Sequence, residues 1–169
     1  ARLTGKRLKF KGHSNLQKYQ YLIHVDSDPG RLNVLIKWLN NGLIQFVKAH
    51  PEKSLFVSQH TERQTIQEEV WVLKIFSWAQ QPRHQLDAWD KFLMPKYSEL
   101  NKIRLPETHT WVRDTNDKTL SQKWASMYDT LIERGLWRDQ IVYSYVIGDS
   151  VKSVYMVERD SPDSFKTKC

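Results

Sequence analysis

The only cysteine of this 169-residue chain is Cys169, the last residue, and this limits how the fold can be held together. No internal disulfide is possible, and a cysteine-based zinc site is excluded because structural zinc sites usually draw on two or more thiolates. The fold must therefore depend on a hydrophobic core. Apolar residues make up 40% of the chain, with seven Trp, seven Tyr and six Phe, which suffices for one domain of this length.

Local patterns predict an α+β fold, with a mainly antiparallel sheet and about three helices packed on it as a single pair of layers. We expect one domain over residues 1–159 and a flexible, solvated tail over 160–169. Three segments show helical spacing of apolar residues, and they begin or end at capping residues such as Asp28, Gly42 and Gly135. The expected helices are 29–40, 83–94 and 118–134.

Strands are expected from shorter patterns. Residues 8–11 alternate apolar and basic side chains, and 18–25 are rich in aromatic and β-branched residues, which together predict a β-hairpin within a basic segment 1–25. A second hairpin is expected at 141–147 and 151–158, and single strands at 43–48 and 54–59. Residues 95–117 are expected to be irregular.

The segment 61–78 is ambiguous. Thr61 to Gln64 resembles a capping box, which favours a helix. Residues 70–78 are crowded with β-branched and aromatic side chains, which favours a buried strand. We expect a strand over 68–78, and the helix remains the alternative.

Charge is unevenly distributed along the chain. The first 25 residues hold six basic side chains and no Asp or Glu, whereas the formal charge of the whole chain is +7. A concentrated basic segment attracts polyanions more strongly than dispersed charge does. In the predicted hairpin, Lys9 and Lys11 would project from one face near Lys18, at a spacing similar to that of successive phosphates. The alternatives are a solvated edge strand that uses lysines against aggregation, or contact with an acidic protein or a membrane surface.

A second basic cluster follows in the irregular segment, where Tyr97 and Trp111 lie among Lys and Arg residues. Exposed aromatic rings beside cations are typical of surfaces that bind single-stranded nucleic acid. Trp111 is the tryptophan that we expect to be most exposed, and the alternative is that it anchors the loop to the core. The predicted nucleic-acid-binding residues are Arg2, Lys6, Arg7, Lys9, Lys11, Lys18, Lys96, Lys102, Arg104, Trp111 and Arg113.

Asp26 and Asp28 follow His24 at the end of a predicted strand, where carboxylates often hold Mg²⁺ or Mn²⁺ in phosphoryl-transfer enzymes. Asp28 is equally explained as a helix cap before Pro29, and Asp26 as a turn residue. No serine-hydrolase, P-loop, dinucleotide-binding or HExxH motif occurs. We therefore assign no catalytic residue, no cofactor and no metal ligand.

These observations favour a nucleic-acid-binding domain that uses a basic N-terminal hairpin, as part of a longer protein or a complex. The alternatives are a metal-dependent nuclease or phosphotransfer enzyme built on Asp26 and Asp28, and an interaction module for an acidic protein surface. No apolar run is long enough to span a bilayer, so no membrane partner is expected. The scarcity of cysteine fits an intracellular location, cytoplasmic or nuclear.

Overall fold

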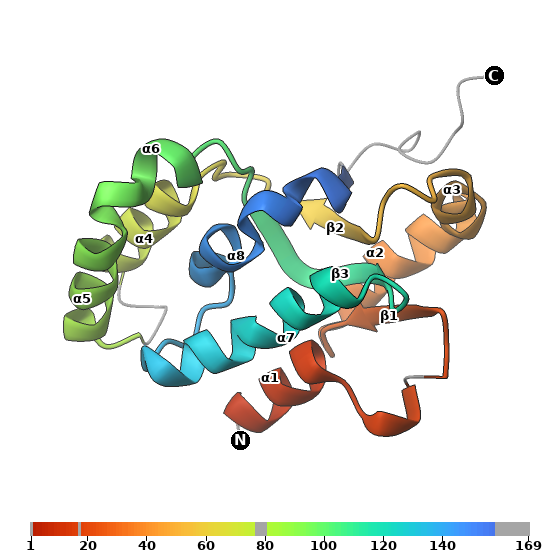
Figure 1. Ribbon diagram of the computed structural model, residues 1–169, viewed down its shortest axis with the longest axis horizontal. Helices are drawn as coiled ribbons and strands as arrows, with labels where there is room; N and C mark the ends of the chain where they lie inside the picture. Colours follow the sequence, from red (N-terminus) through yellow and green to blue (C-terminus); the bar gives the residue numbers. More distant parts are fainter. Residues whose placement is uncertain (1, 17, 77–80, 158–169) are drawn as a thin grey trace.

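The computed structural model describes residues 2–16, 18–76 and 81–157, and its centre is a four-stranded mixed sheet (Figure 1). The strand order is β1-β3-β2-β4, and β3 pairs antiparallel with both of its neighbours. The outer strand β4 runs parallel to β2. The α+β prediction is confirmed. The strands are β1 (Tyr21–Val25), β2 (Leu55–Gln59), β3 (Pro106–Asp114) and β4 (Val154–Val157).

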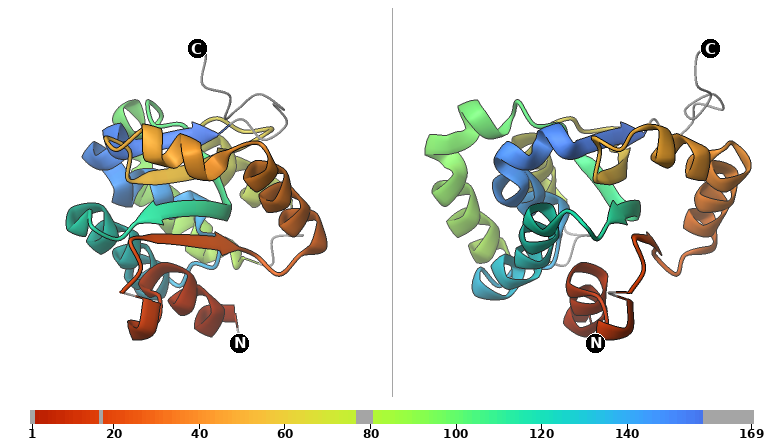
Figure 2. Two further views of the ribbon diagram at one scale, coloured as in Figure 1. Left: turned by 90° about the vertical axis from the view of Figure 1, so that its right-hand side faces the viewer. Right: turned by 45° about the vertical axis from the view of Figure 1, so that its right-hand side comes forward.

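Helices cover both faces of this sheet, so the fold has one more layer than expected (Figures 1 and 2). On one face, α2 and α3 bury Trp38 and Phe46 against Phe56 and Val112 of the sheet. On the other face, the remaining long helices enclose a larger core around Trp111 and Trp124. The helices are α1 (Arg2–Lys11), α2 (Pro29–Asn40), α3 (Leu43–Ala49), α4 (Ile66–Ile75), α5 (Arg83–Leu93), α6 (Tyr97–Leu100), α7 (Lys118–Glu133) and α8 (Gln140–Ile147).

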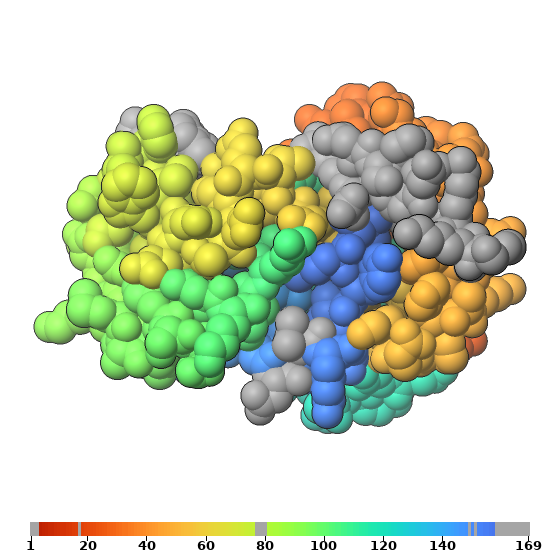
Figure 3. All heavy atoms as spheres, turned by 90° about the horizontal axis from the view of Figure 1, so that it is seen from above, coloured from red at the N-terminus to blue at the C-terminus, as the bar shows by residue number. Residues whose placement is uncertain are grey.

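From above, the segment that carries α8 and β4 lies between the α4–α6 side and the α2–α3 side of the molecule (Figure 3). The shorter 3₁₀ turns are Ser14–Leu16, Met94–Lys96 and Gly148–Ser153. Within the described ranges, no helix has both the length and the apolar character that crossing a bilayer would require.

The three expected helices are confirmed, and strands β1, β2 and β4 lie within three of the segments expected to be strands. Helix α2 begins at Pro29, and the Asp28 side chain accepts a hydrogen bond from the Arg31 amide, as an N-cap does. Gly42 and Gly135 have φ angles of 90° and 63°, the left-handed conformation that glycine adopts without strain. Helices α5 and α7 and strand β2 occupy the predicted segments.

The N-terminal hairpin prediction is wrong, because residues 2–11 form helix α1 and only β1 is a strand. The apolar–basic alternation covered four residues, too few to outweigh the helix propensity of the Leu, Lys and Arg that dominate the segment. Helix α1 packs beside α7 (Figure 1), and its Phe10 ring lies 5.4 Å from the Trp124 ring.

Two further strand predictions are wrong. Residues 43–48 belong to α3, where Leu43, Phe46 and Val47 are buried at helical spacing. Residues 68–75 belong to α4, which begins with a capping box at Thr65 and Glu68 and ends at the C-cap residue Phe76. Residues 77 and 78 lie outside the described residues. In both places burial of a helix face outweighs the β-propensity of single residues.

The C-terminal hairpin is also wrong. Residues 140–147 form α8, and β4 pairs with the distant β2 instead of with its predicted neighbour. Residue 158 and the expected tail 160–169 lie outside the described residues.

The largest omission is β3, because the expected irregular segment 95–117 contains the longest strand of the sheet. Residues 106–113 of this strand are all buried. Its first half, Pro-Glu-Thr-His-Thr, is polar, and polarity indicated a loop. The buried strand is stable only because other elements supply partners for these polar groups, which a local pattern does not show.

Helix α1 predicts an asymmetry between two apolar residues that a hairpin would place on one face. Phe10 is fully buried, whereas Leu8 is 56% exposed. We expect Phe10→Ala to lower the free energy of unfolding by about 3–5 kcal/mol, as for other buried Phe residues, and Leu8→Ala to change it by about 0.5 kcal/mol or less. Denaturant unfolding followed by circular dichroism measures both. Similar losses for the two variants would contradict the helix.

Candidate functional site

A bulge in β3 is the structural origin of the candidate site. Val57 of β2 pairs with Trp111, yet the next residue, Ser58, pairs with Glu107. The three residues 108–110 are therefore extra on the β3 side of this ladder. Bulges of this kind re-aim side chains and are common beside active sites.

The bulge opens into a cavity of about 330 Å³ between the end of β1, the start of α2, helix α1 and the start of α8. We call it the charged cavity, because most of its lining side chains are ionisable. It is lined by Lys6, Lys9, Asp26, Asp28, Arg31, Thr108, His109, Trp137, Arg138, Asp139 and Gln140.

Asp139 is the buried acid at the base of this cavity. The Lys9 Nζ lies 2.8 Å from its Oδ2, and the Lys6 Nζ lies 3.3 Å from the same atom. Burial raises the pKa of Asp139, but the two ammonium groups and a hydrogen bond from the Thr108 hydroxyl outweigh that effect and hold the pKa below its ordinary value. Asp139 is therefore ionised at neutral pH.

Asp26 is held at the mouth of the cavity. Its Oδ1 lies 2.8 Å from His24 Nε2 and 3.4 Å from Lys9 Nζ. Burial raises the pKa of Asp26, but the His24 hydrogen bond and the Lys9 charge have the larger combined effect and lower it. Lys9 thus bridges two carboxylates, and its side chain is only 6% exposed.

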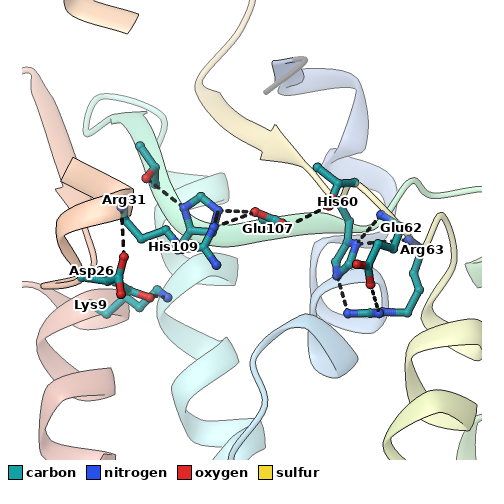
Figure 4. A network of polar contacts seen from close by, with 11 residues as sticks. Lys9, Asp26, Arg31, His60, Glu62, Arg63, Glu107 and His109 are labelled. Carbon is teal, nitrogen blue, oxygen red and sulfur yellow. Dashed lines mark hydrogen bonds and ion pairs between the residues drawn. The ribbon is translucent and has the colours of Figure 1, made fainter. Parts of the chain in front are cut away.

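His109 and Glu107 continue the network into the middle of the sheet (Figure 4). The His109 Nε2 contacts the Glu107 carboxylate, and its Nδ1 lies 2.9 Å from the Thr110 hydroxyl. Arg31 of α2 reaches both groups, at 3.0 Å from His109 Nε2 and 3.3 Å from Glu107 Oε2. The Thr61 hydroxyl donates to the other Glu107 oxygen at 3.4 Å.

The far end of the network is centred on Glu69, which is fully buried in α4. Arg63 contacts this carboxylate directly, and Arg138 lies 3.4 Å from it. His60 accepts hydrogen bonds at Nδ1 from the backbone amides of residues 62 and 63. Burial and the neighbouring Arg63 charge lower the pKa of His60, so the ring is neutral at pH 7.

Three ion pairs of the network share one order of exposure, whereas in the Lys9–Asp26 pair the acid is the more exposed partner. The carboxylates of Asp139, Glu107 and Glu69 are 0–9% exposed, whereas their partners Lys6, Arg31 and Arg138 are 20–32% exposed. Each buried acid thus lies behind a partly exposed cation that lines the cavity. The acids fix where the cations lie, and the cations form the surface that a ligand would meet.

The structure disperses the predicted basic N-terminal surface. Lys6 and Lys9 are paired with Asp139, and Lys11 is paired with Asp129 at 2.6 Å. Arg7 and Lys18 are exposed. The side chain of Arg2 lies outside the described residues.

The second predicted basic cluster does not converge either. Lys96 lies over the Phe92 ring at 3.6 Å, Lys102 pairs with Glu99, and Arg104 donates to Gln59. Arg113 is buried at the end of β3.

The expectation that Trp111 is exposed is wrong, since it is 3% exposed in the core. Its ring stacks on His24 at 5.1 Å and meets Trp124 edge-on at 5.4 Å. The polar residues before Trp111 belong to the buried strand β3 and not to a loop, so Trp111 is buried with them. It therefore offers no face to an unpaired base.

The metal-site alternative receives no support from the geometry. Asp28 is engaged as the cap of α2, and Asp26 is engaged by His24 and Lys9. Across residues 2–16, 18–76 and 81–157, no three His, Cys, Asp or Glu side chains are grouped in a way that would hold a metal ion.

Sequence reasoning missed Asp139, Glu107 and Arg31 as site residues. The missed signal is the run Glu107-Thr108-His109-Thr110, in which ionisable groups alternate with β-branched residues directly before Trp111 and Val112. Asp139 directly precedes the apolar run of α8, where an acid is a common helix-start residue. Nothing local indicates that these segments meet.

Comparisons with known proteins do not place the chain in a family, because no family model, curated protein or solved structure matches it. The functional argument therefore rests on the geometry of the charged cavity.

The buried Lys9–Asp139 pair predicts a large difference between two acids that bind N-terminal lysines. We expect Asp139→Asn to lower the free energy of unfolding by about 3–5 kcal/mol, because Lys9 is left in a buried place with only the more distant Asp26. Asp129→Asn removes an exposed pair with Lys11 and is expected to cost about 1 kcal/mol or less. Denaturant unfolding at neutral pH measures both, and equal losses would refute the buried pair.

Proposed function

We propose that the protein binds a small molecule that carries a phosphate group and hydroxyl groups, and that the charged cavity is its binding site. The observation that carries this proposal is that Lys6, Arg31 and Arg138 line the cavity and are each paired with a carboxylate that is more buried than the cation. Cations held in fixed positions by buried acids are preorganised for an oxyanion, because little side-chain entropy is lost on binding. Arginine in particular matches the geometry of phosphate oxygens.

The Asp26 carboxylate at the mouth of the cavity restricts which groups the ligand can place beside it. The Asp26 carboxylate is 46% exposed and is held in its ionised form by its neighbours. A fixed anion there accepts hydrogen bonds and repels a second negative group, so it favours the hydroxyl groups of the ligand. A cavity of about 330 Å³ is large enough for a ligand of the size of a sugar phosphate.

Ribose 5-phosphate and ribose form a matched pair of probes for isothermal titration calorimetry. We expect the phosphorylated sugar to bind and ribose to bind at least about tenfold more weakly. Arg31→Gln is expected to weaken binding of ribose 5-phosphate by about tenfold or more, because a hydrogen bond to a charged group contributes about 1.5–3 kcal/mol. Arg104→Gln is the control, since Arg104 is exposed and does not line the cavity. Equal affinities for the two sugars, or an unchanged affinity in Arg31→Gln, would reject the site.

We propose nucleic-acid binding as a second candidate function, on the observation that Arg7 and Lys18 of the acid-free N-terminal segment remain exposed. They would contact phosphates without reading bases. We expect affinity for single-stranded oligonucleotides, measured by fluorescence anisotropy, to fall steeply with salt and to weaken in Arg7→Glu/Lys18→Glu. The matched control is Lys37→Glu/Lys48→Glu, which changes the charge equally through exposed residues of α2 and α3. Salt-independent affinity, or equal effects of the two double variants, would reject this function.

A further inference from the structure

A buried arginine without a counter-ion stands at the end of β3. Arg113 is 6% exposed, and no carboxylate pairs with it among the described residues. The only hydrogen bond of its guanidinium is a 3.5 Å contact from Nη1 to the Ser121 carbonyl, and its Nε has no partner within the described part of the chain. Burial lowers the pKa of Arg113, and no acidic neighbour opposes that effect. A buried cation in this state is costly to the fold unless something pairs with it.

Arg113 lines a second cavity, of about 350 Å³, which we call the Arg113 pocket. It lies between the end of α1, strand β1 and the start of α7, and it shares no lining residue with the charged cavity. Lys11, His13 and Lys118 also line it, and its described lining contains no Asp or Glu. Lys118 is held by the Thr115 carbonyl at 3.0 Å, so this wall is positive and partly fixed.

Four apolar residues also line the Arg113 pocket. Leu16, Leu22 and Ala125 are among them, together with Phe10, which is fully buried. The pocket therefore combines cationic and apolar lining, which suits a ligand with an apolar body and a single anionic end.

A purely structural role accounts for Arg113 only in part. Its guanidinium carbon lies 5.8 Å from the centre of the Trp111 ring, within the range of a cation–π contact. That contact does not supply an acceptor for Nε, which has no hydrogen-bond partner among the described residues. The donors are the part of the side chain that requires an acceptor.

We propose that the Arg113 pocket binds a small organic oxyanion, whose carboxylate or phosphate monoester accepts hydrogen bonds from Arg113 and whose apolar body packs on Leu16 and Leu22. Lys118 adds a second positive charge to the lining, whereas Lys11 is paired with Asp129. This site is separate from the charged cavity and does not depend on the function proposed for it.

Benzoate, phenyl phosphate and neutral benzamide are suitable probes, because they share an aromatic body and differ in charge. We expect one or both oxyanions to bind in calorimetric titrations and benzamide to bind at least about tenfold more weakly. The tighter of the two oxyanions identifies the anionic group. Arg113→Met is expected to weaken that binding by about tenfold or more, and Arg104→Gln, at an exposed residue that lines neither cavity, is expected to leave it unchanged.

Arg113→Met also distinguishes a binding residue from a structural one. Without ligand, the thermal unfolding midpoint of the variant should equal or exceed that of the native chain, because the substitution removes an unpaired buried charge. A lower midpoint would assign Arg113 to the fold and overturn the proposal. Should that variant not fold, Lys118→Gln provides the binding test, with a loss of affinity of about threefold or more expected. Failure of both oxyanions to bind at about 10 mM, or affinities that neither variant changes, would also overturn it.

Discussion

Strand β3 is buried along residues 106–113 although most of these side chains are polar or charged, and the rest of the structure depends on how this conflict is resolved. A buried ionisable group is tolerated only when it is paired. Glu107 recruits Arg31 from α2, and Thr108 meets the Asp139 carboxylate at the start of α8. Asp139 in turn draws Lys6 and Lys9, so α1 is fixed to the sheet through charge as well as through Phe10.

The need to pair buried acids explains why the basic residues are concentrated near the N-terminus, where the sequence had indicated a surface for a polyanion. The lysines of the N-terminal segment are not all displayed to solvent, since several neutralise acids more than 100 positions away in the chain. Because α1 contains no acid, its lysines are not neutralised within the helix and can pair with carboxylates of other elements. Charge counted along a sequence therefore indicates an attraction, but it does not show whether the partner belongs to the same molecule.

The parts of the fold that the sequence predicted are those with local causes. Helices α2, α5 and α7 each bury an apolar stripe, Asp28 and Asp117 cap the starts of α2 and α7, and Gly42 and Gly135 follow the ends of these two helices. The parts that were missed are α1, α3, α4, α8 and β3, and the burial of α3, α8 and β3 depends on contacts with residues distant in the sequence. Of the candidate site, Lys6, Lys9, Asp26 and Asp28 were recognised as residues of interest, but their mutual arrangement was not. It arises from the bulge at 108–110, which no short pattern predicts.

The two cavities show opposite solutions to the same problem of polar groups on β3. Around the charged cavity, three buried acids are each paired with a cation, namely Asp139, Glu107 and Glu69. Well-packed apolar residues would stabilise such an interior at least as well. Retaining them fixes Lys6, Arg31 and Arg138 in place, and that is useful only where the position of a cation matters. At Arg113 no acid pairs with the cation among the described residues, and only the Ser121 carbonyl and the Trp111 ring contact its guanidinium, so the proposed ligand would supply its counter-charge. The same strand thus presents one site whose charges are balanced internally and one whose charge is completed by a ligand.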